Sequence, residues 1–549
     1  MFKRIIKNPI VWIFIFALVL RIYKLGTFPY GFHVDEVKAG WNALSIIQTG
    51  MDDHGNLLAS YYNTFGDWRP TGIFYLTTLP IILLGRSEFA VRFSSSLFGA
   101  LTVFPLYLIV YNLSKNKRLS LIASFLLSIS PWHLITSRAT SEVVISTFFA
   151  LFGIYFFIKL INDHRKRFAY LSIGSFLASY CLYHSIRVLA PIFLVAITIY
   201  FLKDLKKRKD KKWVVIAFSI ITFVSLFLGT SKEARERLGQ VSISKDLDLK
   251  YEEARINSEN KRRTIPSLVF DNKSVIYLRK LTDEYLKYFS TGFLTGNSAK
   301  PYRYVSPGAG LLTYIEFILL IVGLISIFKN KYSILPIILL LISPLSAALT
   351  IEDSPNLHRA FLMLPFILTI EAYGLNYLIS LKKKVSPIIF LVLIANFGFF
   401  LNMYFNHSIS HKPYIKDWVL DSSSYRDVGA KDLALKIESE KGDYDKIIIT
   451  NFPDNVYPWY SFFTNKSPRE FNKSILRNSN EVVYKNIIFS DVKCPSDFAF
   501  QKYSDAKILV VDNWECPTEI KIKDGLKAKV VEQISRSDGT LVYTFLERN

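Results

Sequence analysis

The sequence predicts a polytopic, all-helical membrane protein that ends in a small α/β domain, and three observations support this fold class. The chain of 549 residues is 51% hydrophobic and only 20% charged, with a mean hydropathy of +0.25, which is too apolar for a soluble globular protein. Long apolar segments alternate with short polar loops, and every second short loop is basic. After residue 410 the composition becomes polar, and short strand-like runs follow.

The excess of positive charge fits the same fold class. The chain carries 67 Lys and Arg residues against 45 Asp and Glu residues, which gives a formal net charge of +22. In polytopic proteins such charge collects in cytoplasmic loops that face anionic lipid. No basic cluster belongs to a nucleic-acid-binding module. We therefore expect membrane lipid, and no nucleic acid, as a partner of this charge.

The first apolar segment, residues 10–20, is predicted to be a retained membrane span. No small-residue cleavage site follows it, so we do not interpret it as a signal peptide. The basic residues before it predict a cytoplasmic N-terminus. The next apolar run, residues 73–84, is shorter than the roughly 20 residues that a span needs. Residues 26–89 are therefore expected to form one outside loop that contains two surface helices.

From this loop onward the alternation of apolar segments and basic loops is regular. With the first span it gives about eleven transmembrane helices. A long outside segment is expected at residues 231–307. The later spans are predicted at residues 91–111, 119–130, 143–160, 170–183, 188–202, 213–228, 311–328, 334–349, 361–381 and 385–404.

The polar C-terminal part, residues 411–549, is predicted to be an extracytoplasmic α/β domain that follows a membrane domain of residues 1–410. A helical pattern at residues 431–440 precedes the runs KIIITN, NIIFSD, KILVVD, AKVVEQI and TLVYTFLE. Cys494 and Cys516 follow two of these runs closely. They would be close enough for a disulfide if the two strands were parallel neighbours in an oxidising compartment. Two unrelated thiols are the alternative, because strand order cannot be read from sequence.

The predicted topology brings several polar and charged residues to the outside face, each near the end of a span. Arginine binds phosphate bidentately, and a carboxylate can accept a proton from a hydroxyl group. Such a set suits the negatively charged headgroup of a lipid-linked substrate. The residues are Asp35, Glu36, His54, Arg69, Arg138, Glu142, His184, Arg187, His358 and Arg359.

Each of these residues also has a purely structural interpretation. Arg138 and Glu142 are four positions apart and could form an ion pair on a helix surface. Asp35 and Glu36 could complement the dipole at a helix N-terminus. His54, in the segment DDHGN, fits a turn. Polar residues beside span ends can also be interfacial anchors, which is the alternative for His184, Arg187, His358 and Arg359.

The order of these residues resembles that of the membrane-embedded GT-C glycosyltransferases. The nearest similarity is to the protein O-mannosyltransferase-like group, which includes the bacterial aminoarabinose transferases that modify lipid A. The resemblance covers about residues 1–201, covers residues 358–359 more loosely, and leaves the C-terminal domain unmatched. It rests on Asp35-Glu36 at the start of the first outside loop, Arg69-Pro70 before a short apolar helix, and Glu142 after the third span.

The resemblance implies transfer of a sugar, with inversion, from a polyprenyl-phosphate donor to an extracytoplasmic acceptor hydroxyl on a protein, glycan or lipid. It implies that Asp35 is the catalytic base and Glu142 the second acid, although some relatives carry Asp there. Glu36 is either a helper in catalysis or only a charge at the helix start. The candidates for binding the donor phosphate are Arg69, Arg187, Arg138, His358 and Arg359.

Two aspects of the chemistry stay open. Two acids could hold a divalent cation, or arginines could neutralise the phosphate alone, so no cofactor is certain. The competing function is a lipid-linked sugar transporter or flippase without transferase activity. Transporters usually keep ionisable residues near the bilayer midplane. The predicted span interiors are nearly free of charge here and no repeated halves are visible, which favours the transferase.

Overall fold

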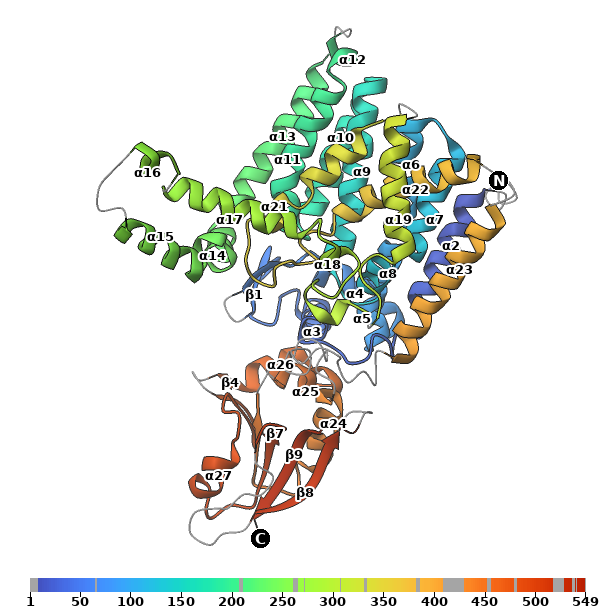
Figure 1. The fold of residues 1–549 in the computed structure, drawn as a ribbon. Coiled ribbons are helices and arrows are strands. Elements are labelled where there is room, and N and C mark those ends of the chain that lie inside the picture. The colour runs from blue at the N-terminus through green and yellow to red at the C-terminus, as the bar shows by residue number, and fades with distance from the viewer. Residues whose placement is uncertain are drawn as a thin grey trace. The chain divides into compact units, whose positions relative to one another are not determined.

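The computed structural model describes residues 8–64, 67–206, 211–259, 265–270, 272–306, 308–329, 333–381, 386–407, 429–451, 456–477, 481–516, 528–535, 539 and 541–548. Contacts within the chain divide it into two compact units, and each is described by itself (Figure 1). The helical unit comprises Met1–Tyr23, Ser60–Gly72 and Ser95–Tyr404. The mixed unit comprises Lys24–Ala59, Ile73–Ser94 and Phe405–Asn549.

The helical unit contains one small hairpin, β1 (Tyr61–Thr64) and β2 (Asp67–Pro70), among its described residues. Its helices before the long outside segment are α2 (Pro9–Ile22), α6 (Val103–Ser114), α7 (Lys117–Ile129), α8 (Pro131–Ser137), α9 (Glu142–Asp163), α10 (Lys166–Tyr180), α11 (Ser185–Tyr200), α12 (Leu202–Lys206) and α13 (Lys212–Gly229). Those that follow are α14 (Lys232–Val241), α15 (Leu247–Glu259), α16 (Ile265–Phe270), α17 (Lys273–Lys287), α18 (Thr291–Leu294), α19 (Tyr314–Lys329), α20 (Leu335–Ile342), α21 (Leu345–Ala348), α22 (Met363–Leu381) and α23 (Ser386–Asn402).

Every predicted span overlaps a helix or a pair of consecutive helices, α5 (Glu88–Leu101) with α6 among them. In the described part of the chain, five helices are long and apolar enough to cross a membrane. The number rises to six if α7 and α8, which meet at a bend of 56°, form one broken span. The all-helical membrane architecture therefore has support, whereas the number of about eleven spans stays a prediction. Several helices, such as α2 and α11, are apolar but shorter than a full span.

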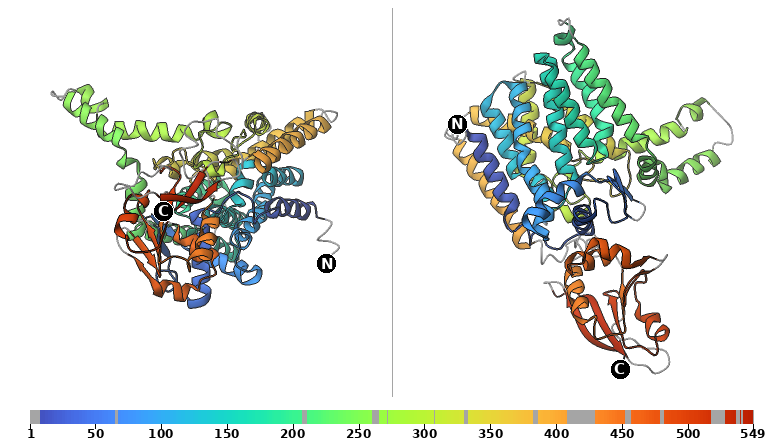
Figure 2. Two further views of the ribbon diagram at one scale, coloured as in Figure 1. Left: turned by 90° about the horizontal axis from the view of Figure 1, so that it is seen from below. Right: turned by 180° about the vertical axis from the view of Figure 1, so that it is seen from behind.

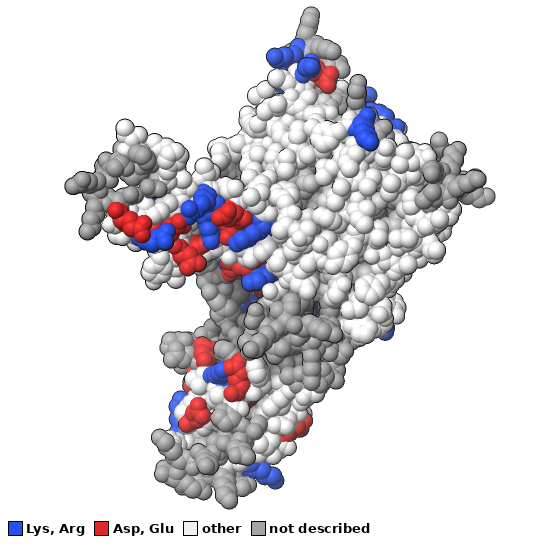
Figure 3. Space-filling view, viewed as in Figure 1, with Lys and Arg blue, Asp and Glu red and all other residues white. Residues whose placement is uncertain are grey.

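The surface of the helical unit has the character expected of a membrane protein. Figure 3 shows a broad face of the bundle without charged side chains, while Lys and Arg gather at the end where α12 lies. The ring of Phe125 in α7 contacts that of Phe16 in α2 and that of Phe390 in α23, with ring centroids 6.3 and 6.1 Å apart (Figures 1 and 2). Phe223 and Phe227 on α13 and Leu391 on α23 are between 66% and 69% exposed. Large apolar side chains so exposed to water would be unfavourable, which fits contact with lipid.

Two glycines allow α19 and α22 to pack closely. A Cβ atom on Gly323 would lie 1.9 Å from the carbonyl oxygen of Ile370, and one on Gly374 would lie 2.2 Å from that of Leu319. Small residues at such crossings let helix backbones approach each other inside a membrane. The two helices could not keep this distance with any larger side chain at either position.

The mixed unit combines α3 (Val34–Thr49), α4 (Gly72–Leu84) and the start of α5 with the C-terminal α/β region. That region contains α24 (Ala430–Glu440), β3 (Lys446–Thr450), α25 (Tyr457–Phe463), α26 (Pro468–Ser474), β4 (Ile475–Arg477), β5 (Glu481–Tyr484), β6 (Ile487–Ser490), α27 (Ser496–Lys502), β7 (Ile508–Asn513), β8 (Ala528–Ser535) and β9 (Leu541–Arg548). The strands form one sheet in the order β4-β5-β6-β3-β7-β9-β8, in which β3 is parallel to β6 and β7 and the other pairs are antiparallel.

Helices cover both faces of this sheet. Phe500 of α27 packs against Ile448 and Val510 on one face. Tyr460 of α25 contacts Phe489 on the other face, with ring centroids 5.8 Å apart. The alternation of side chains along each strand explains this division, because neighbouring residues of a strand point to opposite faces.

The strand-like runs of the sequence form β3, β6, β7, β8 and β9, and the helical pattern at 431–440 forms α24. The short strands β4 and β5 were not predicted. The predicted domain boundary at residue 410 stays a prediction, because it falls among residues 408–428, outside the described residues.

Cys494 and Cys516 form the expected disulfide, with Cα atoms 5.7 Å apart. The expectation that the two strands before these cysteines are neighbours was wrong, because β3 lies between β6 and β7. Each cysteine lies a few residues beyond its strand, Cys494 after β6 and Cys516 after β7. The bond was thus predicted correctly from an incorrect strand order.

Candidate functional site

Helix α3 begins at the segment that carries Asp35 and Glu36. His33 is the N-cap residue, and its Nδ1 accepts a hydrogen bond from the backbone N–H of Asp35 at 3.2 Å. The Glu36 carboxylate accepts a hydrogen bond from the backbone N–H of His33 at 3.1 Å. This reciprocal capping box fixes the first turn of the helix. The two acids lie in that turn, where the helix dipole favours negative charge.

Glu36 is fully buried and forms a bidentate ion pair with Arg92 of α5. Arg92 Nε donates to Oε1 at 2.9 Å, and Nη2 donates to Oε2 at 3.1 Å. The same guanidinium donates to the carbonyl oxygens of Leu25 at 3.1 Å and Gly31 at 2.5 Å. Through Arg92, the Glu36 carboxylate is therefore linked to the backbone of the segment that precedes α3. Arg92 was missed from sequence because it lies inside a segment predicted to be a membrane span.

Asp35 differs from its neighbour in its environment. Its side chain is 23% exposed, and Oδ2 lies 3.5 Å from Nδ1 of His33. A substrate can reach a partly exposed carboxylate, whereas the Glu36 carboxylate is enclosed by protein. Of the two acids at the start of α3, only Asp35 therefore has a partly exposed carboxylate.

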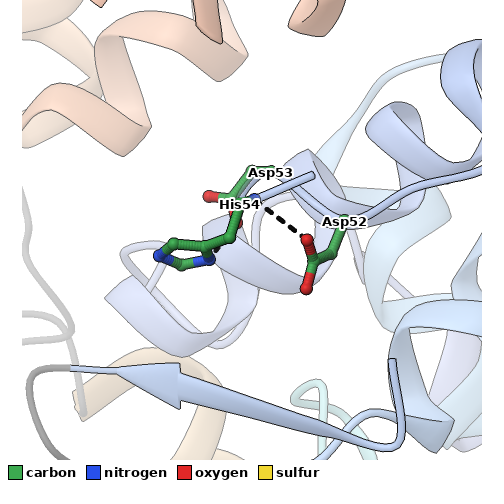
Figure 4. Close-up of side chains that lie close together, drawn as sticks. All are labelled: Asp52, Asp53 and His54. Atoms are coloured by element: carbon green, nitrogen blue, oxygen red, sulfur yellow. Dashed lines mark hydrogen bonds and ion pairs between the residues drawn. The ribbon is translucent and has the colours of Figure 1, made fainter. Parts of the chain in front are cut away.

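Asp52, Asp53 and His54, which follow α3, lie close together (Figure 4). One ligand atom from each lies within 4.8 Å of the others, and two carboxylates with an imidazole suit a divalent cation. Asp52, however, accepts hydrogen bonds from the backbone N–H groups of His54 and Asn56 and from the Asn56 amide. His54 Nδ1 also lies 2.9 Å from Asp53 Oδ1. These contacts are typical of a turn, and a cation would have to compete with them.

In the helical unit, Arg187 and His184 meet the hairpin β1–β2. Arg187 is buried, and its Nε and Nη2 donate to the carbonyl oxygen of Tyr180 at 3.1 and 2.5 Å. Its Nη1 donates to the hydroxyl of Tyr61. The ring of His184 stacks on that of Tyr61 at 5.8 Å, and His184 Nε2 lies 3.1 Å from the carbonyl oxygen of Trp68. The α10–α11 connection is thereby joined to both strands of the hairpin.

Arg69 follows Trp68 in β2. It lies opposite Tyr62 in the antiparallel pair, and its side chain is half-buried. The indole of Trp68 donates to the carboxylate of Glu236 in α14 at 2.6 Å, so β2 is held from two sides. The structure therefore brings Arg69 and Arg187 to the same small group of elements.

Glu142, the first residue of α9, lies near a second group of charges. Burial raises the pKa of Tyr183, which lies in the connection between α10 and α11. The positive charge of Arg359 opposes this rise in pKa, the negative charge of Glu142 adds to it, and Arg237 again opposes it. Glu142 and Arg359 thus both act electrostatically on the Tyr183 phenol.

His358 and Arg359 lie in the segment between α21 and α22. Arg359 Nη1 donates to the carbonyl oxygen of Glu352 at 2.6 Å, and Nη2 pairs with the carboxylate of the same residue. The ring of His358 lies 4.1 Å from that of Tyr304. Both residues thus have local protein contacts, and their binding to a donor phosphate stays a prediction.

Arg138 is fully buried at the end of α2. Its Nη1 donates to the carbonyl oxygen of Leu20 at 2.7 Å, and Nη2 donates to that of Tyr23 at 2.6 Å. Arg138 therefore satisfies carbonyl groups that the helix end leaves without intrahelical partners. No single helix contains both Arg138 and Glu142, since α8 ends before the first and α9 begins at the second. A contact between Arg138 and a phosphate stays a prediction.

The α10–α11 connection joins the two charged groups of the helical unit. His184 and Arg187 contact the hairpin that carries Arg69, and the charges of Glu142 and Arg359 act on the Tyr183 phenol. Asp35 and Glu36 belong to the mixed unit. Sequence reasoning missed Tyr61 and Glu352, because neither residue type marks a phosphate or acid–base site without its partner.

A comparison with protein families gives one match to part of the chain. Residues 68–228 match the sequence model of the family described as dolichyl-phosphate-mannose-protein mannosyltransferase. The matched stretch includes Arg69, Arg138, Glu142 and Arg187. No curated protein sequence matches the chain.

Solved structures resemble the chain in fold. The oligosaccharyltransferase of Archaeoglobus fulgidus in the apo form is 14% identical with a TM-score of 0.50, over 92% of this chain and 69% of that one. Its complex with an inhibitory peptide and a dolichol-phosphate is 13% identical with a TM-score of 0.50, over 93% and 70%. Its complex with zinc and sulfate is 13% identical with a TM-score of 0.48, and there the chain spans 61% of the oligosaccharyltransferase. The family match and the shared fold confirm the resemblance to the GT-C glycosyltransferases.

Proposed function

We propose that the chain transfers a sugar from a polyprenyl-phosphate donor to an acceptor hydroxyl on the extracytoplasmic face of a membrane, with inversion at the anomeric carbon. The observation that carries the proposal is the match of residues 68–228 to a family of dolichyl-phosphate-mannose-dependent mannosyltransferases. Four of the candidate residues lie in that stretch. Enzymes of this kind act on a lipid-linked donor, which fits the multi-pass helical unit.

In the proposed reaction, the oxygen of the acceptor hydroxyl forms a bond to the anomeric carbon of the sugar. The bond from that carbon to the phosphate oxygen breaks, and polyprenyl phosphate leaves with the electron pair. The hydroxyl proton passes to a general base. A carboxylate within hydrogen-bond reach of the hydroxyl can accept it, and this assistance typically accelerates a reaction by roughly 10²–10⁴-fold.

Asp35 is our candidate for the base, because its carboxylate is partly exposed while that of Glu36 is enclosed and paired with Arg92. Glu142 is the second acid. It would orient the acceptor or the sugar from the start of α9.

Arg69 and Arg187 are the candidates for holding the donor phosphate. Both belong to the group of elements around the hairpin β1–β2, and a guanidinium matches phosphate geometry better than an ammonium group does. Arg187 also donates a hydrogen bond to the Tyr61 hydroxyl. Its charge would therefore attract the phosphate, and its hydrogen bond would hold Tyr61 in place. Their positive charge would stabilise the phosphate as it leaves, and this requires no metal ion.

A transporter or flippase remains the second candidate, and one observation favours it. Glu371 in α22 and Glu316 in α19 are buried, and no described residue donates a hydrogen bond to the Glu371 carboxylate. The expectation that span interiors are nearly free of charge is therefore too simple. Buried acids inside transmembrane helices are typical of transport pathways. They do not, however, account for the family match.

Release of polyprenyl phosphate separates the two functions. Purified full-length protein in lipid nanodiscs is supplied with dolichyl-phosphate mannose and with envelope material from cells that lack the gene. The transferase should release dolichyl phosphate and label the acceptor. Movement of intact donor across vesicle membranes without release would instead support the flippase.

A further inference from the structure

Helix α25 of the C-terminal region contacts the segment that leads into α3. The indole Nε1 of Trp459 donates to the carbonyl oxygen of Phe32 at 2.7 Å, across a sequence separation of 427 residues. Trp459 is only 1% exposed and Phe32 only 4%. Phe32 directly precedes His33, the N-cap of the helix that carries Asp35. The hydrogen bond thus fixes the backbone three residues before Asp35.

A close approach between α3 and α25 lies one turn further along. A Cβ atom on Gly40 would lie 2.6 Å from Cε2 of Phe462 and 2.8 Å from Cγ2 of Val91. Next to this glycine, Trp41 contacts Phe471 of α26 edge to face, with ring centroids 5.5 Å apart. The two C-terminal helices therefore follow the shape of α3 closely, and Figure 1 shows α25 and α26 beside it.

Arg86 holds the other end of α25. Its Nη2 donates to the carbonyl oxygen of Ser461 at 2.6 Å, and Nη1 donates to that of Lys466 at 3.1 Å. The guanidinium also lies over the rings of Trp41 at 5.6 Å and Phe462 at 5.1 Å. A positive charge at these C-terminal carbonyl groups is favourable. α25 is thus hydrogen-bonded at one end to the segment before α3 and at the other end to Arg86, whose guanidinium also lies over Trp41 of α3.

Successive carbonyl groups before α3 are held by different partners. Arg92 binds the carbonyl oxygen of Gly31, and Trp459 binds that of Phe32. Arg92 belongs to α5 and Trp459 to α25, so two elements that are far apart in the sequence hold neighbouring carbonyl groups of this segment. The backbone that leads to Asp35 is thus held by both residues.

We propose that the C-terminal α/β region is a positioning element for catalysis, in which α25 sets the orientation of Asp35 and Trp459 is the positioning residue. The proposal rests on the proposed function, since it assumes that Asp35 is the base. A base displaced by about 1 Å can lose a large part of its effect, because proton transfer requires hydrogen-bond reach. This gives the C-terminal region a role in the reaction itself.

The test compares two tryptophan-to-phenylalanine variants of the full-length protein. Trp459→Phe removes the indole N–H but keeps most of the ring. Trp514→Phe, in the same region just after β7, is the matched control. Hydrogen–deuterium exchange of the amides of residues 33–37 reports the order of the first turn of α3 directly. Donor kinetics with dolichyl-phosphate mannose are measured in parallel.

In Trp459→Phe, we expect faster exchange at residues 33–37 and a roughly five- to tenfold fall in kcat, as the loss of one buried hydrogen bond would give. KM for the donor and the unfolding temperature should match those of Trp514→Phe. In an Asp35→Asn background, Trp459→Phe should lower kcat no further, because the group that it positions is already lost. Gly40→Ala should also give faster exchange at residues 33–37 and a lower kcat, through a separate contact, together with a fall in unfolding temperature because its Cβ atom would crowd Phe462 and Val91.

The outcomes separate the two proposals. Exchange and kcat in Trp459→Phe and Gly40→Ala equal to those of Trp514→Phe would overturn the positioning role. An equal fall in kcat with and without Asp35 would also overturn it. Full activity of Asp35→Asn would instead contradict the proposed base, whatever the exchange data show. If Trp459→Phe fails to fold, Gly40→Ala provides the same comparison.

Discussion

Glu36 and Arg92 form a buried ion pair on which the first turn of α3 depends. Glu36→Gln keeps the shape of the side chain but leaves the Arg92 charge uncompensated, which typically costs about 3–5 kcal/mol. We expect a clear fall in unfolding temperature for this variant and none for Asp35→Asn. Combining Glu36→Gln with Arg92→Met should recover part of the loss, because both charges are then gone. Equal unfolding temperatures of Glu36→Gln and the parent would contradict this account of the pair.

Arg69 and Arg187 are expected to lose function when replaced by lysine. A lysine cannot reproduce the planar, bidentate geometry of a guanidinium, and at position 187 it cannot keep the contacts with Tyr180 and Tyr61. We expect KM for dolichyl-phosphate mannose to rise about tenfold or more in each variant. Arg165→Lys, at an exposed position, is the control. Unchanged donor kinetics in both variants would show that the phosphate is held elsewhere.

The sequence could indicate which residues are chemically suited to a site, but not which of them the fold uses for structure. Asp35 and Glu36 are adjacent and equivalent in sequence. They differ in the structure because Glu36 caps the helix through the backbone N–H of His33 and because Arg92 reaches Glu36 across 56 positions of the chain. Arg138 was likewise chosen for its charge, and its contacts with the end of α2 depend on packing that no local pattern encodes.

At the scale of elements, the C-terminal ends of the central strands predict a dependence of stability on pH. Asp512, at the end of β7, is buried, and burial raises its pKa from 3.8 to about 6, although it accepts hydrogen bonds from Ser496. Because the pKa is higher in the folded than in the unfolded chain, folding is favoured by protonation. This contribution is fully present below pH 3.8 and is lost as the pH rises through about 6.

The expected size is about 3 kcal/mol, the product of a shift of about two units and 1.36 kcal/mol per unit. Hydrogen exchange of the β7 amides in the full-length chain measures it. Protection relative to Asp512→Asn should decline between about pH 4 and pH 6 and stay constant above. The comparison with Asp512→Asn cancels the titration of other carboxyl groups. One of these is Glu438: burial acts to raise its pKa, but three hydrogen-bonding partners outweigh burial and lower the pKa. A constant difference over this range would show that Asp512 does not titrate as described.

The elements themselves were predicted with uneven success. Strongly apolar runs such as residues 446–451 and 507–512 became buried strands, because burial on both faces leaves a continuous hydrophobic signal. The strands β4 and β5 contain three and four residues, which is too short for a pattern to show. The break between α7 and α8 coincides with Pro131, which begins the second helix and ends the first.

At the scale of the whole molecule, the alternation of apolar segments and basic loops predicted a multi-pass helical protein, and the family match and fold agree. The pattern was informative because a membrane requires its spans to be predominantly apolar and their polar loops to lie at the membrane surfaces. The sequence did not reveal that residues 24–59 and 73–94 group with the C-terminal region in one compact unit. That grouping depends on contacts such as Trp459 with Phe32, which join the two ends of the chain.

The central claim is that this chain is a polyprenyl-phosphate-dependent glycosyltransferase in which Asp35 is the base. The most direct test measures the turnover of dolichyl-phosphate mannose by the purified full-length protein and by Asp35→Asn, with acceptor material from cells that lack the gene. We expect the parent to release dolichyl phosphate. Asp35→Asn should release it more slowly by a factor of roughly 10² or more, at an unchanged unfolding temperature. Equal rates of release by the two proteins would contradict the role of Asp35, and movement of intact donor without any release would contradict the glycosyltransferase itself.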